Sequence, residues 1–185
     1  MVGQSGEARM TEQALVESIE SATDRVEMLA ARYLAAYPTE DVHAYRAHLE
    51  VVSTGSRLSQ NVSRYLAGRF GINTARYSLL RALYFADEQR LPQVELARTM
   101  SVTSPNVTQL IDALEKEGLV ERETSEADRR VTFARLTQQG VARSEELVPA
   151  MADFMRESCA ALSDEEQQQL VALLSRVRQA LMNEG

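Results

Sequence analysis

Two helical segments in the middle of the chain are separated by a turn too short for them to lie antiparallel, and this feature constrains the fold most. Pro92 opens the first segment, which is short and carries apolar residues at helical spacing. Residues 100–103 form the turn, and Ser104-Pro105 then has the sequence of an N-cap followed by a proline at the first helical position. Helices joined so closely must cross at a steep angle. The sequence therefore predicts a helix-turn-helix unit.

The second helix of this unit has one apolar and one polar face. The positions that we expect to be buried are Val107, Leu110, Ile111 and Leu114. The opposite face is short and mostly uncharged, and consists of Pro105, Asn106, Thr108, Gln109 and Asp112. A helix fits the major groove of DNA, where Asn and Gln side chains can present paired donors and acceptors to base edges. This pattern favours DNA recognition, while solvated residues of an ordinary helix would give it too.

A β-hairpin follows this helix directly. Residues 119–124 and 130–136 can alternate between two faces, and they flank the polar loop 125–129. An arginine on a two-stranded ribbon can enter the minor groove of DNA, where the negative potential is greatest. Asp128 is placed to orient such an arginine, although an ion pair between Asp128 and Arg130 could simply close the hairpin. Helix, turn, polar-faced helix and hairpin follow one another in the order of a winged helix-turn-helix.

Most of the remaining chain has helical periodicity. Apolar residues at alternating spacings of four and three predict a helix over residues 11–37. Thr39 begins a second helix that ends at Gly71, and a third starts near Asn73. Two more helices follow the hairpin, and Ser163 caps the last of them. The fold class that we expect is mainly α, with a small β-hairpin as a wing.

The charge of the chain is negative but unevenly distributed. A net charge of −7 over 185 residues argues against a protein that coats nucleic acid through bulk positive charge. Residues 51–86, however, contain no Asp or Glu but five arginines, Arg57, Arg64, Arg69, Arg76 and Arg81. A local basic surface can therefore exist, unless these arginines pair with carboxylates elsewhere. Neither a membrane span nor a secretory leader is indicated, which predicts a cytoplasmic protein.

The sequence offers little for catalysis or metal binding. It has no glycine-rich phosphate loop, no His-Glu-x-x-His pair and no nucleophile elbow, so we expect no enzymatic activity. His43 and His48 are five residues apart and do not share a helix face. Cys159 is the only cysteine, which excludes a disulfide framework and a cysteine-rich zinc site. We expect no metal, no cofactor and a buried, structural Cys159 thiol.

Three pieces of sequence around the hairpin resemble the MarR family of transcription regulators. They are Leu110-Ile-Asp-Ala-Leu-Glu-Lys-Glu-Gly-Leu-Val-Glu-Arg122, Asp128-Arg129-Arg130 and Leu136-Thr-Gln-Gln-Gly140. The resemblance covers residues 41–183. It implies a homodimer that binds a pseudo-palindromic operator in double-stranded DNA, acting as a repressor relieved by a small-molecule effector.

The resemblance also implies a role for individual residues and segments. In the major groove, the contacts would come from Ser104, Pro105, Asn106, Thr108 and Gln109. On the hairpin, Arg130 would be the wing-tip arginine, Asp128 would brace the wing, and Arg129 would contact phosphate. The chain would consist of an N-terminal extension (1–38), a helical dimerisation region (39–70 and 141–185) and a winged helix-turn-helix lobe (71–140).

The effector and the N-terminal extension are less constrained. For a small aromatic or anionic effector we expect a pocket that includes Tyr65, Arg69 and Tyr77, although tyrosines at helical positions are often ordinary core anchors. The residues before Pro38 resemble the added helix of a subset that includes urate-responsive regulators, but the chain has no Trp, which argues against urate. We expect the apolar stripe of this extension to serve packing rather than sensing.

One rival function is a winged-helix protein-interaction module that has lost DNA binding. The acidic total charge suits it, and so do Asp112 and Glu115, which we expect near the groove-facing surface.

Overall fold

The computed structural model describes residues 26, 28–33, 35–37, 42–124 and 130–183. The chain forms two compact units, of which the first ends at Asn61 and the second is Val62–Gly185. Helix α2 (Val42–Phe70) runs from the first unit into the second. No helix in the described part of the chain is long and apolar enough to span a membrane.

The first unit contains part of the helix that the sequence predicts over residues 11–37. Residues 28–33 and 35–36 are helical, as predicted, while residues 11–25 lie outside the described residues. Val26 and Ala30 are buried, and the ring of Tyr33 stacks on that of Tyr45 in α2 with 4.0 Å between the centroids. Leu29, another member of the predicted apolar stripe, is 36% exposed, so the packing role of the extension stays a prediction. The cap predicted at Thr39 also lies outside the described residues.

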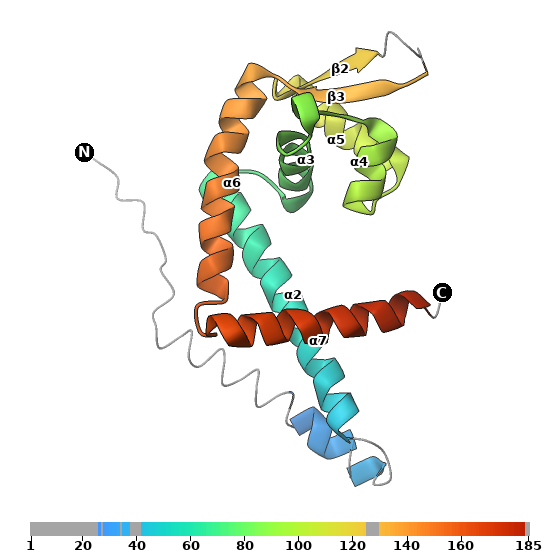
Figure 1. Ribbon diagram of the computed structural model, residues 1–185, viewed down its shortest axis with the longest axis vertical. Helices are drawn as coiled ribbons and strands as arrows, with labels where there is room; N and C mark the ends of the chain where they lie inside the picture. Colours follow the sequence, from blue (N-terminus) through green and yellow to red (C-terminus); the bar gives the residue numbers. More distant parts are fainter. Residues whose placement is uncertain (1–25, 27, 34, 38–41, 125–129, 184–185) are drawn as a thin grey trace, which may run out of the picture. The chain divides into compact units, whose positions relative to one another are not determined.

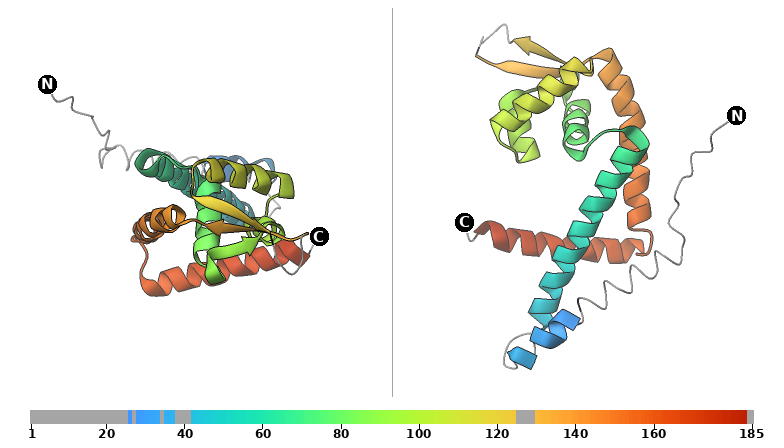
Figure 2. Two further views of the ribbon diagram at one scale, coloured as in Figure 1. Left: turned by 90° about the horizontal axis from the view of Figure 1, so that it is seen from above. Right: turned by 180° about the vertical axis from the view of Figure 1, so that it is seen from behind.

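The second unit carries the winged helix-turn-helix. After the end of α2, its elements in chain order are α3 (Thr74–Tyr84), a 3-10 turn (Asp87–Gln89), β1 (Arg90–Pro92), α4 (Gln93–Met100), α5 (Ser104–Lys116), β2 (Val120–Thr124), β3 (Thr132–Leu136), α6 (Gln138–Ser158) and α7 (Asp164–Asn183). The hairpin β2–β3 projects away from helices α3–α5 (Figures 1 and 2). The predicted fold class, mainly α with a small β wing, is confirmed.

The sheet has three antiparallel strands in the order β1-β3-β2. In the hairpin, Val120 pairs with Leu136 and Thr124 with Thr132. On the other side of β3, Arg90 pairs with Arg135. The sequence analysis missed β1, which has only three residues and ends in Pro92, a residue that sheets tolerate at an edge strand.

The core of this unit surrounds α3. Leu79, Leu80 and Leu83 of α3 are completely or almost completely buried, and they pack against apolar residues from the other elements of the lobe. Those residues, also fully buried, are Leu96 of α4, Ile111 and Leu114 of α5, Val120 of β2, Ala134 of β3, and Leu147 and Met151 of α6. The buried stripe predicted for α5 is therefore confirmed, except that Leu110 is only half-buried.

Short polar contacts join the hairpin to the helix that follows it. The Thr137 hydroxyl accepts a hydrogen bond from the Gly140 N–H (3.0 Å), which caps α6, and donates one to the Gly118 carbonyl (2.6 Å). A Cβ at position 140 would lie 1.9 Å from the Leu119 carbonyl oxygen. Only glycine fits at this position, because the first turn of α6 lies directly against the backbone that enters β2.

Three element boundaries differ from the prediction. The N-cap of α5 is Thr103, so Ser104 is already helical; both are residues that favour caps, and sequence alone does not choose between them. Pro92 ends β1 and precedes α4 instead of opening it. The hairpin strands are shorter than residues 119–124 and 130–136. The predicted cap of α7 is confirmed, because the Ser163 hydroxyl accepts from the Glu166 N–H and the Glu166 carboxylate accepts from the Ser163 N–H.

Candidate nucleic-acid interface

The turn between α4 and α5 is three residues long and has a defined geometry. Ser101 adopts a left-handed conformation (φ 53°, ψ 42°) at the end of α4, and the Val102 N–H donates to the Ala97 carbonyl (3.0 Å). The chain then enters α5 with Val107 and Ile111 directed into the core. This fixes which face of α5 is presented to solvent.

The outward face of α5 carries the side chains predicted to contact the major groove. All five of them are exposed: Ser104, Pro105, Asn106, Thr108 and Gln109. The Thr108 hydroxyl donates a hydrogen bond to the Ser104 carbonyl (3.1 Å), one turn earlier in the helix. This leaves its oxygen lone pairs as acceptors. The face therefore offers both donors and acceptors to a partner.

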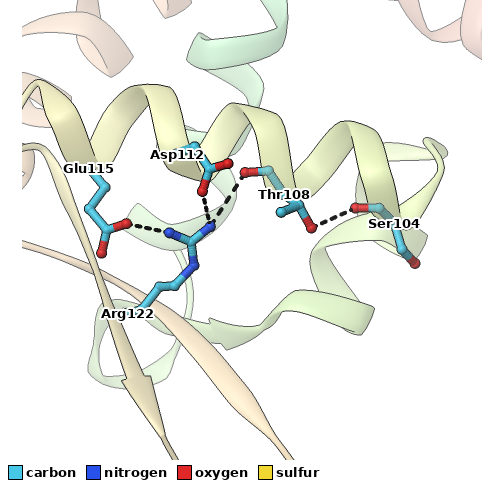
Figure 3. Close-up of polar contacts among 5 residues, drawn as sticks. All are labelled: Ser104, Thr108, Asp112, Glu115 and Arg122. Atoms are coloured by element: carbon cyan, nitrogen blue, oxygen red, sulfur yellow. Dashed lines mark hydrogen bonds and ion pairs between the residues drawn. The ribbon is translucent and has the colours of Figure 1, made fainter.

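Arg122 of β2 neutralises much of the acidic charge on this helix, a feature that the sequence analysis missed. Its guanidinium forms ion pairs with Asp112 and with Glu115, which are one turn apart on α5. One Nη of Arg122 also lies 3.5 Å from the Thr108 carbonyl oxygen. Figure 3 shows the three side chains converging beside the helix. Asp112 and Glu115 are thus not two uncompensated charges in front of a DNA backbone, and the observation that suited the rival function is weakened.

The wing is described on both sides of its tip. Asp128 and Arg129 lie outside the described residues, and Arg130 is exposed. Arg130 lines a pocket of about 320 Å³ with Gln93, Val94 and Thr132, between the start of α4 and the start of β3. Arg130 therefore lies beside the first turn of α4, where the helix-turn-helix begins.

The three residues expected to bind an effector are placed in two different surroundings. The Tyr65 hydroxyl donates to the Ala150 carbonyl (3.3 Å) and its ring stacks on Phe154, while the Arg69 guanidinium lies 5.9 Å from the centre of the Tyr65 ring. Tyr77 is buried, and burial raises the pKa of its hydroxyl, an effect that the nearby Arg81 opposes. The structure brings Tyr65 and Arg69 together, while Tyr77 belongs to the buried core against which Tyr65 packs.

A pocket of about 820 Å³ lies between α3, β1 and the end of α4. It is lined mainly by apolar side chains, among them Phe85, Leu91 and Met100. Arg81 is the one charged residue among its lining residues, and the Arg81 guanidinium also lies 5.8 Å from the centre of the Tyr77 ring. None of the three expected effector residues lines this pocket.

The remaining candidate groups form no evident site. Within the described residues there is no group of three or more His, Cys, Asp or Glu side chains that could hold a metal ion. Cys159 is the C-cap residue of α6 and is half-buried, so its thiol is more accessible than the buried position that we expected.

The comparisons with known proteins point to one family. Residues 70–131 match the model of the MarR family. An HTH-type transcriptional regulator of Bacillus subtilis, YdgJ, is 35% identical over 128 residues, which cover 67% of this chain and 77% of that protein. The HTH-type transcriptional repressor YetL of the same organism is 29% identical over 138 residues, or 75% and 82% of the two chains. A solved structure of Sco3205, a MarR family transcriptional regulator from Streptomyces coelicolor in complex with DNA, matches with a TM-score of 0.65 and 28% identity, over 75% of this chain and 85% of that one.

Proposed function

This chain is a winged helix-turn-helix transcription regulator of the MarR family, and we propose that it acts in the cytoplasm as a homodimeric repressor that binds a pseudo-palindromic DNA operator and is released by a small-molecule effector. The observation that carries the proposal is the outward face of α5, where exposed polar side chains lie beside two acids whose charge Arg122 partly neutralises.

In this proposal α5 lies in the major groove. Asn106 and Gln109 contact base edges, because amide side chains can form paired hydrogen bonds with adenine. Ser104, Pro105 and Thr108 position the start of the helix against the DNA. Since Arg122 neutralises part of the charge of Asp112 and Glu115, the approach to phosphates is less repulsive than the sequence alone suggests.

The wing completes the DNA contact. Arg130 enters the minor groove beside the site read by α5, with Asp128 bracing the wing and Arg129 on a phosphate. The exposure of Arg130 and its position next to the first turn of α4 support this assignment. Minor-groove arginines gain from the negative potential of the narrow groove.

Dimerisation is assigned to the helical region formed by residues 39–70 and 141–185, while residues 71–140 form the DNA-binding lobe and residues 1–38 an extension. Support comes from α7, which has no buried residue in its range and exposes an apolar stripe of Leu170, Leu173, Leu174, Val177 and Leu181. An exposed stripe of this size needs a partner surface, and we propose that a second copy of the chain supplies it. Two lobes held one helical turn of DNA apart would match two half-sites.

For the effector we favour the pocket on α3 over the cluster of Tyr65 and Arg69. The pocket combines apolar walls with the single cation of Arg81, which suits a small aromatic anion. Tyr77 would take part only through Arg81. A ligand that binds the DNA-free arrangement of the dimer more tightly than the DNA-bound one would release the operator.

A gel-shift titration tests the proposal. We would use the wild-type chain with duplexes from the region upstream of its own gene and with random duplexes, over a series of salt concentrations. Sequence-selective binding that weakens steeply with salt is expected, because phosphate contacts release counterions. Absence of binding at low salt would instead support the protein-interaction module.

Two arginine variants sharpen the same experiment. Arg130→Ala should weaken operator binding by about tenfold, within the ~1–3 kcal/mol of a specific contact. Arg156→Ala is the matched control, because Arg156 is 76% exposed near the end of α6 and pairs only with Asp153 among the ion pairs of the described chain. If Arg130→Ala and Arg156→Ala both bind as tightly as the wild type, the wing is removed from the mechanism.

A further inference from the structure

The face of the sheet that points away from the core carries a cluster of four charged side chains. Ala134 and Leu136 of β3 are buried, so Arg135, between them, lies on the opposite face. Arg90 of β1 pairs with Arg135 in the sheet register and lies on the same face. Glu123 of β2 pairs with Phe133, two residues before Arg135, so it lies on the same face but one row nearer to the wing tip. We call Glu88, Arg90, Glu123 and Arg135 the wing-base cluster.

The distances show that the wing-base cluster is a closed network. Arg90 lies 2.8 Å from a carboxylate oxygen of Glu123 and 2.6 Å from one of Glu88. Arg135 lies 2.9 Å from the other oxygen of Glu123 and 4.0 Å from Glu88. The Arg90 guanidinium also lies 4.9 Å from the centre of the Phe133 ring. Each carboxylate therefore lies within 4.0 Å of both guanidinium groups, and these ion pairs join β1 to both strands of the hairpin. The approach of Arg135 Nε to Glu123 is an ion pair without the geometry of a hydrogen bond.

The backbone before β1 is held in an unusual conformation next to this network. Glu88 and Gln89 have positive φ angles of 53° and 54°, a region that residues other than glycine occupy sparsely. Such conformations persist where surrounding contacts hold them. The ion pair of Glu88 with Arg90 is a contact of this kind, so the network also fixes the segment that connects α3 to the sheet.

The wing-base cluster lies at the point where the hairpin leaves the lobe. The last described pair of the β2–β3 ladder is Thr124 with Thr132, and the pair before it is Glu123 with Phe133. Arg130 lies two residues before Thr132 in the chain, on the side of the ladder that leads to the wing tip. A change in the direction of the hairpin at the cluster would therefore displace Arg130.

We propose that the wing-base cluster is a set of positioning residues for DNA binding, which hold the hairpin at the orientation in which Arg130 reaches the DNA. This inference rests on the proposed function. The members are partly exposed, with 30–62% of their side-chain surface accessible, and exposed ion pairs contribute little to stability. The role of the cluster is thus orientation of the wing and not stability of the fold.

The direction in which operator affinity changes when a negative charge is removed distinguishes this proposal from simple electrostatics. Removing a negative charge near a DNA-binding surface ordinarily strengthens binding, because repulsion from phosphates falls. Glu123→Gln should do the opposite and weaken operator binding by about threefold to tenfold, in the lower part of the range of coupling between contacting residues. Glu121→Gln is the matched control: Glu121 lies on the same strand and face, opposite Arg135 in the sheet register, but none of the ion pairs found among the described residues includes it. Its variant should bind as tightly as the wild type or more tightly.

The experiment measures operator affinity of the wild type, Glu123→Gln, Glu121→Gln, Arg130→Ala and the double variant Glu123→Gln/Arg130→Ala by fluorescence anisotropy, with thermal unfolding as the folding control. If the cluster acts through Arg130, the double variant binds no more weakly than Arg130→Ala alone, and Glu123→Gln reduces the salt dependence of binding as Arg130→Ala does. A merely structural role would lower the unfolding temperature and leave the salt dependence unchanged.

The possible failures are distinguishable. A wild type that binds no duplex selectively contradicts the proposed function and this inference with it. A wild type that binds selectively, while Glu123→Gln binds as tightly as Glu121→Gln, overturns the inference alone. Additive effects of Glu123→Gln and Arg130→Ala also overturn it.

Discussion

Helices α5 and α7 are both amphipathic, but the apolar side chains of α5 are buried in the lobe and those of α7 are exposed. In α5, Val107, Ile111 and Leu114 are buried in the lobe and the polar face is left to solvent. In α7 no residue is buried, and Leu173 and Leu181 are 56% and 69% exposed. The difference teaches that a similar periodicity in the sequence marks two kinds of surface. The apolar stripe of α5 serves the fold of one protomer, while that of α7 is exposed in a single chain and is the surface on which we propose that a second copy packs.

The largest expected effect comes from breaking the apolar stripe of α7. Leu174→Lys combined with Val177→Lys should convert the dimer to monomers, because two ammonium groups would have to be buried in an apolar interface. Operator affinity should fall by more than about 100-fold, because binding to two half-sites is lost. Sedimentation equilibrium and anisotropy titration measure the two effects.

Its control adds the same two charges to the polar face of α7. Gln168→Lys combined with Gln179→Lys should leave both the dimer and the affinity unchanged, since these exposed glutamines lie away from the stripe. A dimer that survives the Leu174 and Val177 changes would show that α7 is not the interface.

The next effect concerns the buried stripe of α5. Ile111→Ala should lower the free energy of unfolding by about 2–5 kcal/mol, because Ile111 is fully buried and its removal leaves a cavity. Urea denaturation measures the loss. Leu181→Ala in α7, measured in the monomeric Leu174/Val177 variant, should cost less than about 0.5 kcal/mol because Leu181 is exposed there. Similar losses for both would erase the contrast between the helices.

Substitutions on the outward face of α5 should affect DNA binding and leave stability almost unchanged. Gln109→Ala should change the free energy of unfolding by less than about 0.5 kcal/mol, because the side chain is exposed. It should weaken operator binding by about 1–3 kcal/mol and relax the sequence preference at one position of each half-site. Selection of binding sites from a random duplex pool reveals the relaxed position, with Gln179→Ala as the control. An unchanged preference would place base recognition on other residues.

The smallest effect is the pH dependence of the α7 cap. Hydrogen bonds from the backbone N–H and the hydroxyl of Ser163 lower the pKa of Glu166 below its ordinary value of 4.5. Since the folded-state pKa is lowered, the stabilisation is present above pH 4.5 and is lost as the pH falls through the folded-state value. The stability difference between the wild type and Glu166→Gln should therefore shrink from pH 7 toward pH 3. A constant difference would mean that the charge of Glu166 plays no part in the cap.

The elements that follow from local rules could be predicted from the sequence. The stripe of α5, the short turn before it and the Ser163–Glu166 cap all depend on residues within a few positions of one another, and the structure contains all three. The choice between Thr103 and Ser104 as the N-cap failed because two adjacent residues have the same capping chemistry. The three-residue strand β1 gave too short a pattern to detect.

The ion networks could not be predicted, because their partners are far apart in the sequence. Arg122 is ten residues from Asp112, and Arg135 is 47 residues from Glu88. A strand that alternates charged and apolar residues looks the same whether its arginines face DNA, solvent or carboxylates. Only the register of β1, β2 and β3 decides which charges meet. The contacts of Asp128 and Arg129, and the effector role of Tyr65, Arg69 and Tyr77, stay predictions.

The close approach at Gly140 has a mechanical consequence for regulation. Because the first turn of α6 touches the Leu119 carbonyl and Thr137 bridges to Gly118, no compressible layer of side chains separates this helix from the root of the hairpin. We therefore expect α6 and β2 to move as one rigid body, so that a tilt of α6 rotates β2 by the same angle. Because α6 is 21 residues long, a small displacement of its far end tilts the helix by a few degrees. We expect that tilt to change the direction in which the wing points.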